Sequence, residues 1–199
     1  MTSQESTSTT ELSPLLRDAA RGVLPPWTRV SAGRLAHMGR VAALLREWAE
    51  RLRLPETEAD RWCAAGWLHD ALRDAPEAEL RGLVPDAFCD VHPLLLHGPA
   101  CAEKVDGDAD EEFREAVRYH TLGSASFGML GKALYLADFM EPGRSFDPAW
   151  TASLRARMPG EMAEVLREVV DARVRHVGGS GEVHPATRAF HRAVMEGAA

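Results

Sequence analysis

Apolar residues recur at helical spacing along most of the chain from Ser31 onward. The clearest stretch runs from Ala32 to Arg53 and stops before Pro55. Its apolar stripe comprises Val41, Leu44, Leu45, Trp48 and Leu52. Residues three or four positions apart share one face of a helix, so the stripe predicts a helix with one buried side. No convincing run of alternating, β-branched residues indicates a strand, and the pattern therefore predicts an all-α fold.

The same periodicity predicts a series of helices after Pro55. One begins at Thr57-x-x-Asp60, which is similar to a capping box. The others are expected over residues 91–106, 110–121, 127–140, 160–177 and 185–196. The run Gly178-Gly179-Ser180-Gly181 predicts a flexible joint between the last two helices.

The two parts of the chain differ in composition. Residues 1–24 are expected to form an N-terminal tail, disordered at least to about residue 12, because MTSQESTSTTEL is polar and of low complexity. Residues 25–199 are expected to form a single helical domain, with a helical extension after about residue 178. A chain of 199 residues, 45% of them hydrophobic, is long enough to bury one sizeable core.

Charge and cysteine content narrow the functional classes. The formal net charge of -7 argues against a nucleic-acid polymer as partner, and an anionic substrate would need local positive charge. No apolar run approaches the ~20 residues of a membrane span, and the N-terminus does not read as a leader, so we expect no membrane association and a cytoplasmic location. Cys63, Cys89 and Cys101 are an odd number without C-x-x-C spacing, which predicts buried, reduced thiols.

Several His and Asp residues lie on the apolar faces of the predicted helices. They are His37, His69, Asp70, His120 and Asp138, each three, four, seven or eight positions from apolar residues of its own helix. A lone inward His is more often a hydrogen-bonded core residue than a metal ligand. An inward carboxylate, however, needs a partner or a cation. Because several such residues occur on successive helices, one metal site would satisfy them together.

Read in order, Arg34-x-x-His37, His69-Asp70, His97, His120 and Asp138 resemble the HD-domain superfamily of metal-dependent phosphohydrolases. Four local strings narrow the resemblance: Trp-Leu-His-Asp-Ala-Leu-Arg-Asp at 67–74, Leu-Leu-His-Gly-Pro at 95–99, Arg-Tyr-His-Thr at 118–121 and Ala-Asp-Phe-Met-Glu-Pro-Gly-Arg at 137–144. They are similar to the YqeK-like branch, the bacterial symmetrical bis(5'-nucleosyl)-tetraphosphatases. The match covers roughly residues 25–175 and implies an HD-domain helical bundle.

The resemblance also implies a dinuclear metal centre. One ion would be held by His37, His69, Asp70 and Asp138, and the second by Asp70, His97 and His120. Asp70 would bridge them, and Asp70 and Asp138 would be the catalytic carboxylates. Imidazoles with carboxylates suit two divalent ions such as iron or manganese, with iron expected first by family analogy. The implied reaction is symmetrical cleavage of diadenosine tetraphosphate, a small nucleotide, to two ADP.

Four residues beside these ligands are candidates for supporting roles. Arg73, Thr121 and Arg144 are expected to contact phosphate, although an Arg near a helix end is often simply solvated and Thr121 could merely end its helix. The family usually has Lys in place of Arg73. Asp74 is expected to orient a ligand His, or otherwise to pair with Arg73 at the surface.

The remaining histidines belong to none of the family strings and are expected to be surface or structural residues: His92, His176, His184 and His191. The segment Arg167–Arg175 alternates basic and acidic residues and reads as a solvated helix face. The Trp residues are expected to be core anchors and not base-stacking platforms.

Two other functions remain open. One is a different HD-type hydrolase of another nucleotide, which a substrate panel would separate from the first reading. The other is a catalytically silent HD module that binds a nucleotide or metal, which metal analysis and activity would separate. The oligomeric state is also open, with a homodimer among the arrangements considered.

Overall fold

The structure is a computed structural model that describes residues 11–178 and 183–197. Its α-helices are α1 (Pro14–Ala20), α2 (Ala32–Arg51), α3 (Glu56–Leu68), α4 (Glu77–Arg81), α5 (His97–Lys104), α6 (Glu111–Tyr119), α7 (Met129–Met140), α8 (Pro148–Arg157), α9 (Met162–Gly178) and α10 (Pro185–Glu196). Two short 3-10 helices, η1 (Asp86–Phe88) and η2 (Pro93–Leu95), precede α5. The described residues contain no strand, so the predicted all-α class is confirmed. Among them, no helix combines the length and apolar content needed to cross a bilayer.

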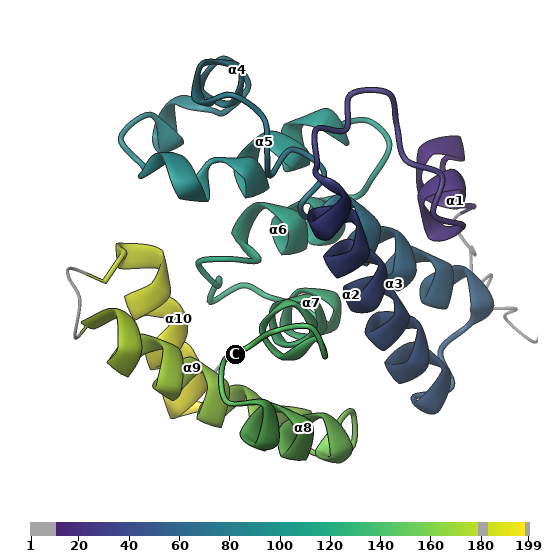
Figure 1. Ribbon diagram of the computed structural model, residues 1–199. Coiled ribbons are helices and arrows are strands. Elements are labelled where there is room, and N and C mark those ends of the chain that lie inside the picture. The colour runs from purple at the N-terminus through teal and green to yellow at the C-terminus, as the bar shows by residue number, and fades with distance from the viewer. Residues whose placement is uncertain (1–10, 179–182, 198–199) are drawn as a thin grey trace, which may run out of the picture.

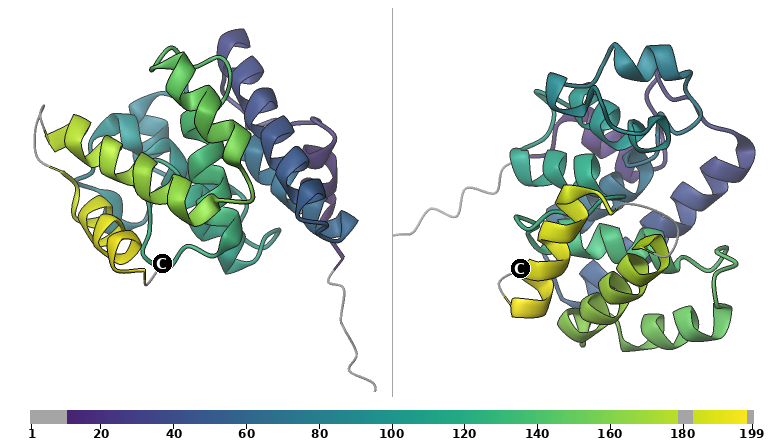
Figure 2. Two further views of the ribbon diagram at one scale, coloured as in Figure 1. Left: turned by 90° about the horizontal axis from the view of Figure 1, so that it is seen from below. Right: turned by 90° about the vertical axis from the view of Figure 1, so that its left-hand side faces the viewer.

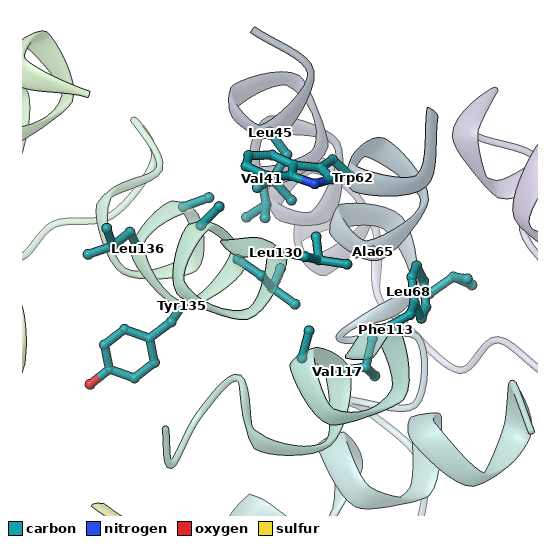
Figure 3. Close-up of a cluster of buried hydrophobic side chains, with 14 of the residues drawn as sticks. Val41, Leu45, Trp62, Ala65, Leu68, Phe113, Val117, Leu130, Tyr135 and Leu136 are labelled. Atoms are coloured by element: carbon teal, nitrogen blue, oxygen red, sulfur yellow. The ribbon is translucent and has the colours of Figure 1, made fainter. Parts of the chain in front are cut away.

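Helix α7 occupies the centre of the fold (Figure 1) and packs against α2, α3, α6, α8 and α9. Its sequence is apolar on nearly every side, and a helix of that kind is stable only when it is surrounded. Leu130 of α7 lies in the cluster formed with Trp62, Ala65 and Val117 (Figure 3), whereas Tyr135 points away from it. The central position of α7 places Asp138, near its end, inside the protein.

Helices α2 and α3 lie side by side and form the densest pair of the fold (Figures 1 and 2). Their close approach depends on Gly66, where an added Cβ would lie 2.5 Å from Cα of Ala42. Val41 and Leu45 of α2 face Trp62 of α3 in the same cluster (Figure 3). This contact fixes the distance between the helix that carries His37 and the helix that ends at His69.

Helix α1 departs from the expected organisation. Residues 1–24 were predicted to form a tail, but Pro14–Ala20 is helical and buries Leu16 and Ala19 against α3. A local signal marks its start, because Ser13 accepts a hydrogen bond from the backbone N–H of Leu16 and Pro14 occupies the first turn. The disorder predicted for the first residues lies outside the described residues up to residue 10.

Helix boundaries differ from the predictions in several places. Helix α3 begins at Glu56 after Pro55, and no side chain caps it, so the capping box predicted at Thr57 does not form. The segment 91–106 divides into η2 and α5, because its backbone tightens to a 3-10 turn before His97. Helix α4 is too short to give a clear periodic pattern and was not predicted, and the sequence analysis also missed α8. Of the cysteines expected to be buried, Cys89 is exposed.

Helices α9 and α10 pack against each other at one side of the molecule (Figure 2). The segment after Gly178, whose role the motifs left open, is anchored through Phe190, which is buried with its ring centroid 5.2 Å from that of Tyr135 on α7. Gly123 makes room for this ring, since it has a φ of +80° and an added Cβ would lie 2.0 Å from Phe190. The joint predicted at 178–181 falls mostly outside the described residues.

We expect Gly66→Ala to lower the free energy of unfolding by about 1–3 kcal/mol, because the added methyl group meets the backbone of Ala42 and one helix must move. Urea titration followed by circular dichroism measures the change. Gly33→Ala is the matched control, since an added Cβ at Gly33 of α2 has nothing within 4 Å. It should leave stability unchanged or raise it by up to about 1 kcal/mol. Equal stability of the two variants would show that the helix contact does not depend on Gly66.

Candidate metal centre

Six buried polar side chains converge between the helices. They are His37 of α2, His69 and Asp70 at the end of α3, His97 at the start of α5, His120 just after α6 and Asp138 of α7. None is more than 7% exposed, so the inward orientation predicted from helical periodicity is confirmed for those that it covered. His69 caps the C-terminus of α3, where its backbone N–H still donates to the carbonyl of Ala65, and the following turn directs Asp70 into the interior.

The carboxylate of Asp70 faces a different pair of histidines with each of its oxygens. Oδ2 lies 3.6 Å from Nε2 of His37 and 3.5 Å from Nε2 of His69. Oδ1 lies 3.0 Å from Nε2 of His97 and 3.5 Å from Nε2 of His120. Two groups with metal-ligand spacing therefore share Asp70, one with His37 and His69 and the other with His97 and His120.

Asp138 adds to the first of these groups. Its Oδ1 lies 3.1 Å from Nε2 of His37 and 3.9 Å from Nε2 of His69. Burial by itself would raise the pKa of Asp138, but the contact with His37 and the charge of Arg144 hold it well below its usual range. Burial opposes ionisation of Asp70 too, but His69, His120 and His97 keep the pKa of Asp70 well below its usual range. The side chains of Asp70 and Asp138 are therefore both ionised at neutral pH.

His69 presents a lone pair to this cluster. Its Nδ1 lies 2.9 Å from the backbone carbonyl of Gly66, and because a carbonyl only accepts, Nδ1 carries the proton. Burial lowers the pKa of His69 to about 4, so the ring is neutral at pH 7. Its Nε2 then directs a lone pair toward the oxygens of Asp70 and Asp138, which are themselves acceptors. A cation between them would convert this repulsion into coordination.

The hydrogen-bond inventory fits a metal as well. Nε2 of His37 and Nε2 of His69 are buried and have no hydrogen-bond partner, although carboxylate oxygens lie 3.1–3.9 Å away. Buried polar atoms without partners are uncommon in folded proteins. A divalent cation takes the lone pairs of neutral imidazoles together with carboxylate oxygens, so these residues fit the metal site that the sequence predicts.

The second group has the same character. Nδ1 of His120 donates to the carbonyl of Val117 at 2.7 Å, which leaves its Nε2 free to act as an acceptor or ligand. That atom lies 3.1 Å from Nε2 of His97 and 3.0 Å from Oγ1 of Thr121. Burial lowers the pKa of His97, which favours the neutral form that binds a metal.

Gly98 explains why a glycine follows His97. An added Cβ would lie 2.9 Å from the carbonyl of Arg118 and 3.2 Å from Cε1 of His120. Helix α5 can therefore approach the end of α6 closely enough for His97 and His120 to meet only if this position has no side chain. The short string Leu-Leu-His-Gly-Pro thus determines a helix spacing as well as supplying a candidate ligand.

Glu141 supports His37 in a way that the sequence reasoning missed. Its Oε1 lies 3.1 Å from Nδ1 of His37, and its Oε2 accepts from Arg40 and from the backbone N–H of Gly143. Burial opposes ionisation, yet Arg40 and His37 lower the pKa of Glu141 to about 2. The signal in the sequence that could have identified Glu141 is its position three residues after Asp138.

Asp74 does not have either of its expected roles. Its Oδ2 accepts a hydrogen bond of 2.6 Å from the backbone N–H of Ser31, next to the start of α2. The Nδ1 atoms of His37, His69 and His120 face Glu141 and two backbone carbonyls instead. Asp74 lies at the exposed end of the turn after α3. Its hydrogen bond anchors the beginning of α2, the helix that carries His37.

Comparison with known proteins identifies the family. Residues 34–158, more than half of the chain, match the HD domain. The chain belongs to the HD-domain family. A solved structure from Clostridium acetobutylicum, described as a predicted HD-superfamily hydrolase involved in NAD metabolism, has the same fold. Its TM-score is 0.72 at 22% sequence identity, over 91% of this chain and 95% of that chain.

Curated relatives of this HD domain share part of its sequence. The chain is 33% identical over 108 residues to the symmetrical bis(5'-nucleosyl)-tetraphosphatase of Bacillus subtilis, covering 50% of this chain and 56% of that protein. It is 33% identical over 90 residues to the protein of the same name from Halalkalibacterium halodurans, covering 41% of this chain and 48% of the relative. The chain thus spans about half the length of the curated relatives it matches.

A pocket of about 370 Å³ opens beside the candidate metal ligands of the HD domain. Arg34, Arg73, Arg144 and Arg173 line it, as does Thr121. Nη1 of Arg34 donates to Oδ2 of Asp70 at 2.7 Å, and Arg144 donates to Asp138.

The pocket gathers the three expected phosphate contacts and adds two residues that sequence reasoning missed. Arg34 was quoted only as part of a motif. Arg173 belongs to the segment expected to be a solvated helix face, and its place in the pocket corrects that expectation.

We expect Asp70→Ala to lose both bound ions, because both ligand groups share this carboxylate. His97→Ala removes a ligand of one group only and should keep the ion held by His37, His69 and Asp138. Metal content of the purified variants, measured by inductively coupled plasma mass spectrometry, distinguishes these results. Asp86→Ala, an exposed aspartate outside the site, is the control and should match the wild type. Metal content of Asp70→Ala equal to the wild type would refute the bridging role.

Proposed function

We propose that this HD domain hydrolyses dinucleoside polyphosphates and cleaves diadenosine tetraphosphate symmetrically to two ADP. The observation that carries the proposal is the placement of Asp70 between two histidine groups at the wall of an arginine-lined pocket. Membership of the HD-domain family supports a metal-dependent phosphohydrolase. The names of the relatives from Bacillus subtilis, Halalkalibacterium halodurans and Staphylococcus aureus support the symmetrical reaction.

The metal ligands proposed are those expected from the sequence. His37, His69, Asp70 and Asp138 would hold one ion and Asp70, His97 and His120 the other, with iron as the first choice and manganese as the second. When bound, such ions supply a nucleophilic water at neutral pH and stabilise charge on phosphate oxygens. Asp70 and Asp138 would hold the ions in place. Glu141 would fix the orientation of the His37 ring through its contact with Nδ1.

The pocket also answers how a chain with net charge -7 attracts a polyphosphate. Arg34 and Arg144 are paired with Asp70 and Asp138 in the structure, so their charges are partly committed. Two divalent ions against the same two carboxylates would leave about two net positive charges by simple counting. Arg34 and Arg144 would then be free to contact phosphate oxygens beside Arg73.

Incubation of the purified chain with diadenosine tetraphosphate and Mn²⁺, or Fe²⁺ without oxygen, should give ADP as the sole nucleotide product. Anion-exchange chromatography of the products measures this directly. AMP together with ATP as products would refute symmetrical cleavage. Turnover of a different nucleotide in a parallel panel, in place of diadenosine tetraphosphate, would identify that nucleotide as the substrate. Asp70→Ala should give no product under the same conditions.

Arg73→Gln should lower kcat/KM for diadenosine tetraphosphate by about 10- to 100-fold, because a hydrogen bond to a charged group contributes roughly 1.5–3 kcal/mol. Arg73 lines the pocket but pairs with neither metal-ligand carboxylate, so metal content should stay at the wild-type level. Arg192→Gln changes an exposed arginine of α10 outside the pocket and is the control. Unchanged kcat/KM in Arg73→Gln would exclude Arg73 from substrate binding.

A further inference from the structure

The pocket beside the candidate metal centre is also lined by apolar and aromatic side chains that the phosphate chemistry does not use. They are Phe139, Phe146 and His176, together with Leu94 and Leu95. Phe146 is 46% exposed and Leu94 is 58% exposed, although both are large apolar side chains. Apolar side chains exposed within a pocket that also holds convergent polar groups are typical of ligand-binding surfaces.

The aromatic side chains among them form a connected cluster with Trp150. The ring centroid of Phe146 lies 5.7 Å from that of Phe139, 6.1 Å from that of Trp150 and 6.0 Å from that of His176. All three pairs have edge-to-face geometry. Such contacts hold the Phe146 ring in place while nearly half of the residue stays accessible. His176, expected from the sequence to be a surface or structural residue, therefore belongs to the pocket.

Arg173 of α9 connects this cluster to the metal centre. Its guanidinium carbon lies 4.7 Å from the ring centroid of Tyr135 and 5.7 Å from that of Phe139. Its Nη2 also donates to the backbone carbonyl of Thr121 at 2.9 Å, directly after the ligand His120. The distance between the aromatic cluster and the metal ligands is therefore fixed by the packing of α9 against α7.

We propose that Phe146 and His176 form a stacking surface for the nucleobase of the substrate, while the arginines and metal ions bind its phosphates. The inference rests on the proposed function for the identity of that substrate. A nucleotide joins an anionic chain to a flat aromatic base, and the pocket is lined by arginines as well as by aromatic side chains. Stacking accepts any base because every base has a π-face. The surface therefore selects nucleosides over bare phosphates without selecting one base.

Binding of two probes separates this role from phosphate binding. The full chain loaded with Mn²⁺ is titrated calorimetrically with ADP and with inorganic pyrophosphate. Phe146→Ala should raise the Kd for ADP by about 5- to 100-fold, the range expected for loss of base stacking, and leave the Kd for pyrophosphate unchanged. His176→Ala should likewise raise the Kd for ADP and leave the Kd for pyrophosphate unchanged, and Phe146→Trp should bind ADP as the wild type does.

Met129→Ala is the matched control, because Met129 is an apolar residue that is 50% exposed at the start of α7 and lies outside the pocket. It should change neither constant. Equal weakening of both probes by Phe146→Ala would show that the residue only positions the phosphate-binding residues, and unchanged binding of ADP would remove the stacking role. Either result overturns the inference. Failure of the wild type to cleave diadenosine tetraphosphate would instead refute the proposed function, since these titrations do not depend on turnover.

Discussion

The burial of the Asp70 carboxylate is the constraint on which the rest of the structure depends. Moving an ion of this kind out of water costs several kcal/mol unless opposite charge and hydrogen bonds compensate it. Asp70 is 2% exposed, and Arg34 and the histidines from α2, α3, α5 and α6 all direct nitrogen atoms at it. The helices therefore meet around a buried carboxylate that needs positive charge nearby. Because Nε2 of His69 offers a lone pair and no proton, a metal ion is the indicated source of that charge.

Close helix contacts give this point its dimensions. Gly66 lets α2 and α3 touch through backbone atoms, and Gly98 does the same for α5 and the end of α6. Helix α7, apolar on nearly every side, fills the centre and brings Asp138 toward His37. Because protein interiors are close-packed, a shift of one helix would be transmitted to the ligands. Packing that has no chemical role of its own thus sets distances on which metal binding depends.

Much of the candidate site could be predicted from the sequence because its residues interrupt a regular pattern. His37 and Asp138 are polar positions within apolar helical stripes, and burial confirms their orientation. His97 starts a helix after a 3-10 turn, where no period exists, so only its local string identified it. Arg173 alternates with acidic residues like any solvated residue, and its place in the pocket follows from how α9 packs. Tertiary contacts decide such positions, and periodicity carries no information about them.

The pocket is completed by residues from beyond the segment that matches the HD domain. All six proposed metal ligands lie within residues 34–158, the part that matches the HD domain, whereas Arg173 and His176 lie beyond it on α9. A metal centre alone would act on any phosphoanhydride that reached it, since it contacts only phosphate and water. Helix α9 adds Arg173 and His176 to an aromatic surface that Phe139 and Phe146 of the matched segment also form. Under the proposed function, selection of the substrate would therefore depend on the matched segment and on α9 together, whereas the metal ligands all come from the matched segment.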